Sequence, residues 1–352
     1  MDTQKNIRVA INGFGRIGRA FLKVAREHGG IEVVAVNDLG DIKNMAYLLK
    51  YDTVYRNYRP EVTAREGDKP AIIIDGQEVL FLSQKDPLQL PWKALNIDVV
   101  VESTGLFTSY DKANVHIAAG AKRVVISAPA KDDPAAQGAA PAIAGATVLM
   151  GVNTENLKNV VVTSNASCTT NAGSPLIAIL DEALGIEKAI LNTVHGYTAS
   201  QGIVDGPNKK DYREGRAAAM NIVPSSTGAA IAVTKAFTKL TGKFDGISIR
   251  VPVVAGSIVD ITFISKKPTT AAEVNDILRK AAATERWKGI FAASDEELVS
   301  SDILGNPHAS IADLKMTRVV DGTLVKVMGW YDNEMGYTHT LVEHVMKAGG
   351  LI

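Results

Sequence analysis

The chain has 352 residues, in which 38 Lys and Arg balance 38 Asp and Glu. This balance excludes the basic surface expected of a protein that binds nucleic acid or an anionic membrane. No apolar run approaches the roughly 20 residues that span a bilayer, and the N-terminus lacks the basic and then apolar segments of a signal peptide. The length predicts two domains, each able to bury its own core.

Cysteine usage indicates a reducing compartment. The single cysteine forbids an intrachain disulfide, so we expect a cytoplasmic protein. By count alone, a single thiol is more often an apolar filler in a core than a reactive group, so only its surroundings in the sequence can favour a chemical role.

The N-terminal segment has the pattern of a βαβ unit. A β-rich run covers 7–12, apolar residues at helical spacing follow in 19–28, and a second strand is expected over 31–36. This order is typical of the start of a dinucleotide-binding domain.

Between the first strand and the helix, Gly13, Gly15 and Gly18 fit the pattern G-x-G-x-x-G. The glycines permit a tight turn and close approach to a pyrophosphate at the helix N-terminus, although glycine-rich turns also occur for structural reasons. Asp38 lies about 20 residues after Gly18, where a carboxylate bonds both ribose hydroxyls of NAD and repels the 2′-phosphate of NADP. The alternative is a solvated residue at the end of a strand. The whole unit favours an NAD site.

The same domain continues with further strands. Strands are expected over 97–102 and 123–127, with a helix over 112–119 between them. A stretch rich in Ala, Pro and Gly from 128 to 145 is interpreted as a surface loop, because strand-like sequence resumes at Thr147.

Cys168 follows an apolar run and lies in the polar segment 164–171, before a helix expected over 175–184. This arrangement places the thiol at or near a helix N-terminus, where the dipole favours a thiolate. A hydroxyl-rich turn is also an unusual place for an apolar filler. We therefore interpret Cys168 as a nucleophile.

His195 is the best candidate for its proton acceptor. It ends a strand expected over 189–194, whereas the other five histidines lie in helix-like or exposed settings. A histidine at a strand end is by itself more often structural, and separation along the chain cannot prove the pairing.

Several motifs in chain order resemble phosphorylating glyceraldehyde-3-phosphate dehydrogenase. The segments are Asn12–Arg19, Ser164–Asn171, Asp205–Pro207, Ser226–Ala230, Arg250–Pro252 and Trp330–Tyr337. The resemblance implies an NAD-binding Rossmann domain over 1–167, completed by a C-terminal helix within 332–352, and an α+β catalytic domain over 168–331. Independently, 246–251, 257–265 and 324–330 alternate as antiparallel strands do, which favours a mainly antiparallel sheet there.

The resemblance also implies the reaction and its residues. Cys168 attacks the aldehyde of glyceraldehyde 3-phosphate, His195 takes the proton, hydride passes to NAD, and inorganic phosphate cleaves the thioester. No metal is implied, and the family resemblance implies a homotetramer. Two anions must be held, the phosphate of the substrate and the attacking inorganic phosphate. Thr198 and Arg250 match the family residues that hold the substrate phosphate. The residues that match those around the inorganic phosphate are Ser167, Thr169, Thr227 and Gly228. The matching cofactor residues, besides the three glycines and Asp38, are Arg16, Ile17, Lys85, Ser127 and Asn333.

Some alternatives remain open at this level. Arg250 would also suit a structural ion pair, although a charge inside an alternating strand favours a pocket. Lys85 stands where the family usually has arginine, and 132–146 resembles an insertion. Two other functions remain possible for this sequence. The chain could be an erythrose-4-phosphate dehydrogenase, or a catalytically dead relative that acts as a binding or regulatory protein.

Overall fold

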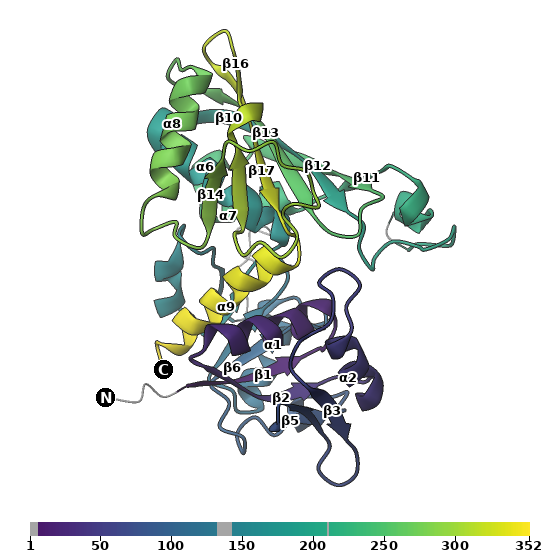
Figure 1. Ribbon diagram of the computed structural model, residues 1–352. Helices are drawn as coiled ribbons and strands as arrows, with labels where there is room; N and C mark the ends of the chain where they lie inside the picture. The colour runs from purple at the N-terminus through teal and green to yellow at the C-terminus, as the bar shows by residue number, and fades with distance from the viewer. Residues whose placement is uncertain (1–5, 132–142, 210) are drawn as a thin grey trace. The chain divides into compact units, whose positions relative to one another are not determined.

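The computed structural model describes residues 6–131, 143–209 and 211–352, and the chain divides into two compact units (Figure 1). The first unit comprises Met1–Val148, Thr154–Ala166 and Leu341–Ile352, and the second comprises Leu149–Asn153 and Ser167–Thr340. The predicted domain boundary lay between 167 and 168, and the expected return of the chain lay within 332–352. The expected loop over 128–145 falls largely outside the described residues.

Within its described residues, the first unit has a nine-stranded sheet in the order β3-β4-β5-β2-β1-β6-β7-β9-β8. In this sheet order, each neighbouring pair from β5 to β8 is parallel. At the other edge, β3 pairs antiparallel with β4, and β4 pairs antiparallel with β5. The strand bounds are β1 Ile7–Asn12, β2 Ile31–Asn37, β3 Val62–Arg65, β4 Ala71–Ile74, β5 Gln77–Leu82, β6 Val99–Glu102, β7 Arg123–Ile126, β8 Gly145–Thr147 and β9 Val162–Ser164. Strand order reverses at β1, which lies between β2 and β6, so a crevice for a ligand is expected at their carboxyl ends.

The helices of the first unit are short, apart from the one after the glycine motif. Their bounds are α1 Arg16–His28, α2 Ile42–Lys50, α3 Tyr110–Ala113 and α4 Val115–Ala118. Helix α1 begins directly after Gly15, three residues before the predicted start. The helix predicted over 112–119 is instead two short helices that meet at Asn114.

The second unit has, among its described residues, an eight-stranded sheet in the order β11-β12-β10-β13-β17-β15-β14, with β16 beside β17. Most pairs are antiparallel, as predicted, but β10 and β12 pair in parallel, as do β14 and β15. The strand bounds are β10 Ile186–Gly196, β11 Val223–Ser226, β12 Phe244–Val251, β13 Ser257–Ser265, β14 Phe291–Ser294, β15 Ser310–Asp313, β16 Arg318–Val320 and β17 Leu324–Tyr331.

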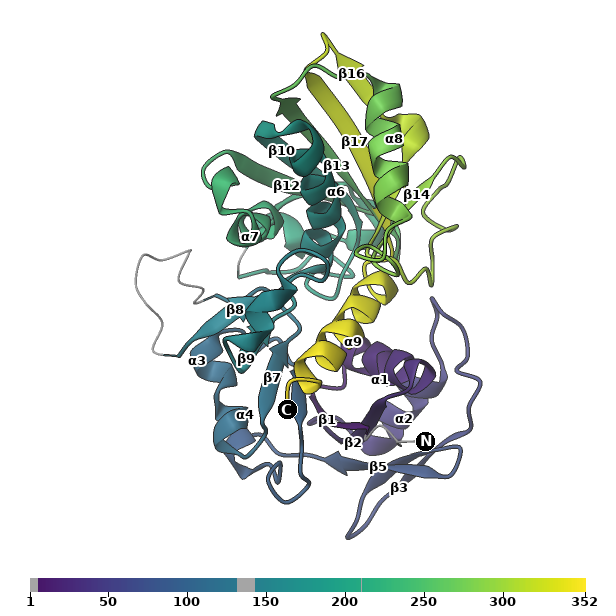
Figure 2. The same ribbon diagram turned by 90° about the vertical axis from the view of Figure 1, so that its left-hand side faces the viewer.

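Helices α6 Cys168–Leu184, α7 Ala229–Ala236 and α8 Ala271–Ala282 belong to the second unit (Figure 2). Helix α6 begins seven residues before the predicted start, and Pro175 lies inside it. Its buried side chains, including Leu176 and Leu180, share one apolar core with β13 and β17. This packing fixes the helix whose first turn carries the cysteine.

Helix α9, Met335–Gly349, begins in the second unit and ends in the first. Near its end, buried His344 lies 2.9 Å from the Thr163 hydroxyl and 3.0 Å from Asn165 Oδ1. Among the described residues, no helix is long and apolar enough to cross a membrane.

Candidate active site

Cys168 is the first residue of α6, and the turn before it is shaped locally. Ala166 adopts a left-handed conformation, with φ of 55°, which bends the chain sharply between β9 and α6. The Ser167 hydroxyl caps the helix by accepting a hydrogen bond from Thr170 N at 3.1 Å. Cys168, a half-buried residue, therefore lies at a helix N-terminus, as the sequence predicted.

The structure brings His195 to this thiol. His195 lies near the end of β10, is buried, and places its Nε2 3.4 Å from Cys168 Sγ. Its Nδ1 is 2.6 Å from the carbonyl oxygen of Gly196. In the tautomer with its proton on Nδ1, His195 donates to this carbonyl, and Nε2 presents a lone pair to the thiol. The guanidinium Nη1 of Arg250, which only donates, lies on the same ring nitrogen and suits the opposite tautomer.

Arg250 completes this cluster from the neighbouring strand. It pairs with His195 in the parallel register of β12 and β10, and its Nη1 lies 2.7 Å from His195 Nδ1. Its Nε is buried without a hydrogen-bond partner, and the guanidinium forms no ion pair with any residue in the described ranges. An uncompensated guanidinium at a site favours an anion from outside the protein over a structural ion pair.

Burial and charge set the titration of these groups. Burial raises the pKa of the Cys168 thiol, and the positive charge of Arg250 and hydrogen bonds at Thr169 act in the opposite direction. The net direction is upward, opposite to the effect expected from the helix terminus alone. Burial, followed by the charge of Arg250, lowers the pKa of His195 to about 4. His195 is therefore a neutral base near pH 7.

The remaining substrate residues are spread over the second unit. Thr198 places its hydroxyl 3.0 Å from that of Ser200, and Thr227 Oγ1 accepts a hydrogen bond from Ala229 N at 3.2 Å. Exposed Gly228 is the N-cap of α7. Their roles in holding two phosphates remain predictions.

The glycine motif has the geometry that a pyrophosphate site needs. Gly13 has φ of 95°, and a Cβ added to it would lie 2.6 Å from Thr104 N; one added to Gly18 would lie 2.2 Å from the Gly13 oxygen. Gly15 has open space beside its Cα and is the N-cap of α1, where no side chain caps the helix. These residues fit a dinucleotide phosphate held by backbone N–H groups.

Asp38 follows β2 and reaches the same turn. Its Oδ2 accepts a hydrogen bond from Phe14 N at 2.7 Å, and its Oδ1 accepts one from Gly40 N at 2.8 Å. A carboxylate has about four lone-pair sites, so capacity remains for ribose hydroxyls. The aspartate thus holds the glycine turn in addition to its predicted contact with the ribose.

The other predicted cofactor residues have varied settings. Arg16 Nη1 lies 3.2 Å from Asp52 Oδ2, and Lys85 is exposed in the loop after β5. Asn333 is buried in the second unit, where its Oδ1 accepts hydrogen bonds from Gly256 N and the Ser257 hydroxyl. This orients its amide group as a donor. Half-buried Ile17 lies in the first turn of α1, and half-buried Ser127 directly follows β7.

Comparison with known proteins identifies the family. Residues 7–110 match the sequence family described as glyceraldehyde 3-phosphate dehydrogenase, NAD binding domain. Residues 167–333 match the family described as glyceraldehyde 3-phosphate dehydrogenase, C-terminal domain. The glyceraldehyde-3-phosphate dehydrogenase of Borreliella burgdorferi is 46% identical over 348 residues, covering 97% of this chain and 99% of the relative. The chain belongs to the glyceraldehyde-3-phosphate dehydrogenase family.

Two further relatives agree. The glyceraldehyde-3-phosphate dehydrogenase of Streptomyces coelicolor is 46% identical, covering 97% of this chain and 98% of its own. Glyceraldehyde-3-phosphate dehydrogenase 2 of Saccharomyces cerevisiae is 44% identical, covering 97% of this chain and 100% of its own. The recognised family, the Rossmann and mainly antiparallel fold, and the NAD cofactor are thereby confirmed.

The family motifs did not reveal Tyr331 as part of the site. Its buried hydroxyl lies 2.9 Å from the Thr169 hydroxyl and 2.8 Å from that of Thr193, and its ring meets the His195 ring at an interplanar angle of 72°. Tyr331 thus connects the first turn of α6 to the strand that carries the histidine. Tyr331 directly precedes Asp332 and Asn333 in the segment Trp330–Tyr337, and this position in a family motif could have indicated that it belongs to the site.

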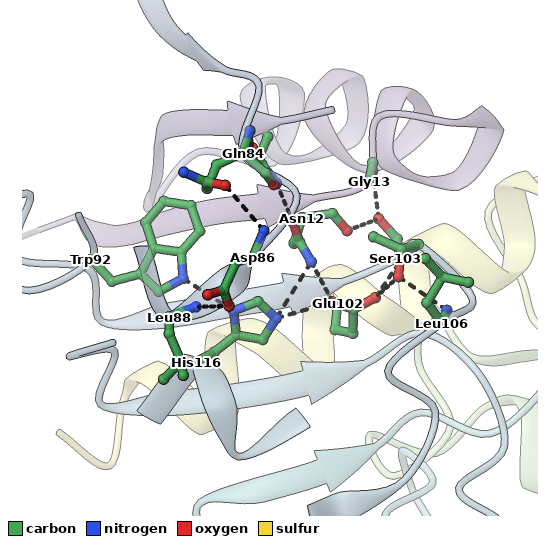
Figure 3. A network of polar contacts seen from close by, with 12 residues as sticks. Asn12, Gly13, Gln84, Asp86, Leu88, Trp92, Glu102, Ser103, Leu106 and His116 are labelled. Carbon is green, nitrogen blue, oxygen red and sulfur yellow. Dashed lines mark hydrogen bonds and ion pairs between the residues drawn. The ribbon is translucent and has the colours of Figure 1, made fainter. Parts of the chain in front are cut away.

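A second missed feature lies behind the glycine turn. His116, placed among the helix-like or exposed histidines, is fully buried and lies 3.0 Å from buried Glu102 (Figure 3). Helical spacing alone does not show which face of a short helix is covered, so this pair could not be predicted from the sequence.

Proposed function

We propose that this chain oxidises glyceraldehyde 3-phosphate to 1,3-bisphosphoglycerate with NAD and inorganic phosphate, through a thioester on Cys168. The contact of 3.4 Å between Cys168 Sγ and His195 Nε2 carries the proposal. The names and identities of the relatives support the substrate, and an intact Cys168, His195 and Arg250 argue against a catalytically dead relative.

The first step is attack of sulfur on the aldehyde carbon. As the C–S bond forms, the thiol proton passes to the lone pair of His195 Nε2, and the carbonyl becomes the oxyanion of a hemithioacetal. The protonated imidazole then donates to this oxygen, which stabilises the developing charge. A neutral histidine is needed for this step, in agreement with its lowered pKa.

Bound NAD supplies the acceptor for the hydride that leaves the hemithioacetal carbon. The chain would contribute orientation: the glycine turn would hold the phosphates, Asp38 would hold the adenosine ribose, and the side-chain N–H groups of Asn333 would donate hydrogen bonds to the nicotinamide carboxamide. His195 accepts the hydroxyl proton as the thioester forms.

Inorganic phosphate then attacks the thioester carbon, and the C–S bond breaks to return the thiolate of Cys168. Protonated His195 returns its proton to this sulfur, so Cys168 ends as a thiol, and the attacking hydrogenphosphate releases its own proton to solvent. Ser167, Thr169, Thr227 and Gly228 are proposed to hold this phosphate by hydroxyl and backbone N–H groups.

The phosphate of the substrate is proposed to bind at Thr198 and Arg250. Arg250 has no anionic partner in the described chain, and its charge is one cause of the low pKa of His195. A phosphate at this guanidinium offsets that charge and raises the pKa of His195. The base is therefore strengthened when its substrate is present.

We also propose a cytoplasmic homotetramer. A nucleophilic thiol must stay reduced, which suits the cytoplasm. The described segments 201–209 and 211–222 expose apolar side chains that a monomer would leave in water: Ile203, Val204, Tyr212, Met220 and Ile222. Light scattering would measure the assembly, and a monomer at micromolar concentration would contradict it.

The test is NADH formation by the purified protein with glyceraldehyde 3-phosphate, with and without inorganic phosphate. We expect phosphate-dependent turnover, little activity with erythrose 4-phosphate, and almost none in Cys168→Ser. His195→Asn should slow turnover by roughly 10²–10⁴-fold, the usual contribution of a positioned acid–base group. Substantial activity of Cys168→Ser would exclude the covalent route.

A further inference from the structure

The carboxyl ends of β2, β1 and β6 are connected by side chains to which the proposed reaction assigns no role. Asn12, Glu102 and His116 are each at most 1% exposed, and their polar groups form one network (Figure 3). Two of the paths in this network start from groups that only donate, the backbone N–H of Gln84 and the indole N–H of Trp92. These two donors determine every proton position between them and Glu102.

The first path starts at Gln84. Its backbone N–H donates to Asn37 Oδ1 at 2.8 Å, which identifies that atom as the amide oxygen. Asn37 Nδ2 therefore donates to Asn12 Oδ1 at 2.7 Å. Asn12 Nδ2 in turn donates to Glu102 Oε2 at 2.6 Å.

The second path starts at Trp92. Its Nε1–H donates to His116 Nδ1 at 3.1 Å, so Nδ1 carries a lone pair. The imidazole is then the neutral tautomer with its proton on Nε2. That proton is donated to Glu102 Oε2 at 3.0 Å.

A third group of donors reaches the other carboxylate oxygen. The backbone N–H of Thr104 donates to Glu102 Oε1 at 2.8 Å, and the Thr104 hydroxyl does so at 2.5 Å. Every polar neighbour of Glu102 in the network is thus a donor. Glu102 only accepts, and it is a buried carboxylate anion stabilised by four hydrogen bonds.

This anion shapes the backbone beside the glycine turn. The loop that begins at Thr104 packs so closely on Gly13 that a Cβ there would lie 2.6 Å from Thr104 N. Ser103 Oγ also donates to the Gly13 oxygen at 2.6 Å. Asn37, on the first path, directly precedes Asp38. The network therefore fixes both segments proposed to hold the dinucleotide.

We propose that Glu102 is a positioning residue for NAD, acting through the loop after β6 and the end of β1 without touching the cofactor itself. The proposal rests on the NAD site in the proposed function. A buried donor without its acceptor is costly, so the backbone shifts when the carboxylate is removed. The glycine turn is then no longer preorganised for the pyrophosphate.

The test compares Glu102→Gln with wild type. Glutamine has the same shape, but one of its two terminal atoms is an NH₂ group that faces donors. We expect the Kd for NAD, measured by calorimetry, to rise roughly tenfold or more. At saturating NAD, kcat and the KM for the aldehyde should stay within about twofold. Glu32→Gln, which removes an exposed partner of Arg8 in the same unit, is the matched control and should bind NAD normally.

Two histidine variants keep the test decisive if Glu102→Gln folds poorly. His116→Gln places an amide N–H where Nε2 donates and should retain NAD affinity, whereas His116→Leu removes the donor and should weaken binding as Glu102→Gln does. An unchanged Kd for NAD in Glu102→Gln would overturn the positioning role. So would an equal loss of NAD affinity in His116→Gln and His116→Leu accompanied by an equal fall in kcat. A wild-type protein that bound no NAD would instead overturn the proposed function.

Discussion

Arg250 and His195 lie opposite each other in the parallel register of β12 and β10, with Arg250 Nη1 2.7 Å from His195 Nδ1. The same guanidinium is proposed to bind the substrate phosphate, and its charge lowers the pKa of the base. Substrate binding and proton transfer are therefore linked through one side chain.

Replacing Arg250 tests this link. A hydrogen bond to a charged group contributes about 1.5–3 kcal/mol, so Arg250→Ala should lower kcat/KM for the aldehyde by roughly 10–100-fold, mainly through KM. Removing the charge should also raise the pKa of His195 in the free enzyme, measured by NMR titration. Arg279→Ala, which breaks an exposed pair with Asp295, is the control. An unchanged KM for the aldehyde would remove Arg250 from the substrate site.

Tyr331→Phe tests the bridge between the first turn of α6 and β10. The change leaves the Thr169 and Thr193 hydroxyls without their shared partner, so we expect a loss of about 1–3 kcal/mol in the free energy of unfolding. The rate of Cys168 alkylation should change as well, because the helix turn and His195 are no longer tied together. Exposed Tyr212→Phe should affect neither quantity. Equal stability of both variants would show that the bridge contributes nothing measurable.

Cofactor preference tests Asp38. The 2′-phosphate of NADP would place a second anion near its carboxylate, and such a pair costs several kcal/mol. We expect NAD to be preferred by roughly a hundredfold or more in kcat/KM. Asp38→Asn keeps an oxygen that accepts from Phe14 N but removes the charge, so it should narrow the preference with less damage than Asp38→Ala. Wild-type protein that used both cofactors equally would contradict this assignment.

Acid should destabilise the protein through two buried histidines. Burial lowers the pKa of His195 to about 4 and that of His344 to about 3, against about 6.5 in an unfolded chain. Between pH 6.5 and 4 the unfolded chain therefore binds more protons at both sites. Each histidine contributes up to about 1.4 kcal/mol of lost stability per pH unit as the pH falls through that window.

Urea unfolding at pH 7 and pH 5 measures this effect. His344→Gln should reduce the difference between the two pH values, whereas exposed His28→Gln should leave it unchanged. An equal pH dependence in wild type and His344→Gln would mean that His344 does not titrate on unfolding in this range.

The features that could be predicted from the amino-acid sequence alone are those that depend on local geometry. Gly13 and Gly18 specify a turn that side chains at these two positions would block. The position of Cys168 near a helix N-terminus follows from the polar turn before it. The predicted start of α6 at 175 was seven residues too late, because the Ser167 side chain caps the helix at Cys168 and Pro175 lies inside it. The family motifs then supplied residue roles that spacing alone does not give.

Tertiary structure decided which distant groups meet. The contact between Arg250 and His195 depends on a parallel pairing of β12 and β10, which strand alternation does not reveal. The convergence of donors on Glu102 likewise requires three strand ends to lie together. Proton positions, burial and pKa values depend on neighbours brought together by folding, and the physical reason is that a side chain responds to the atoms around it and not to its place in the chain.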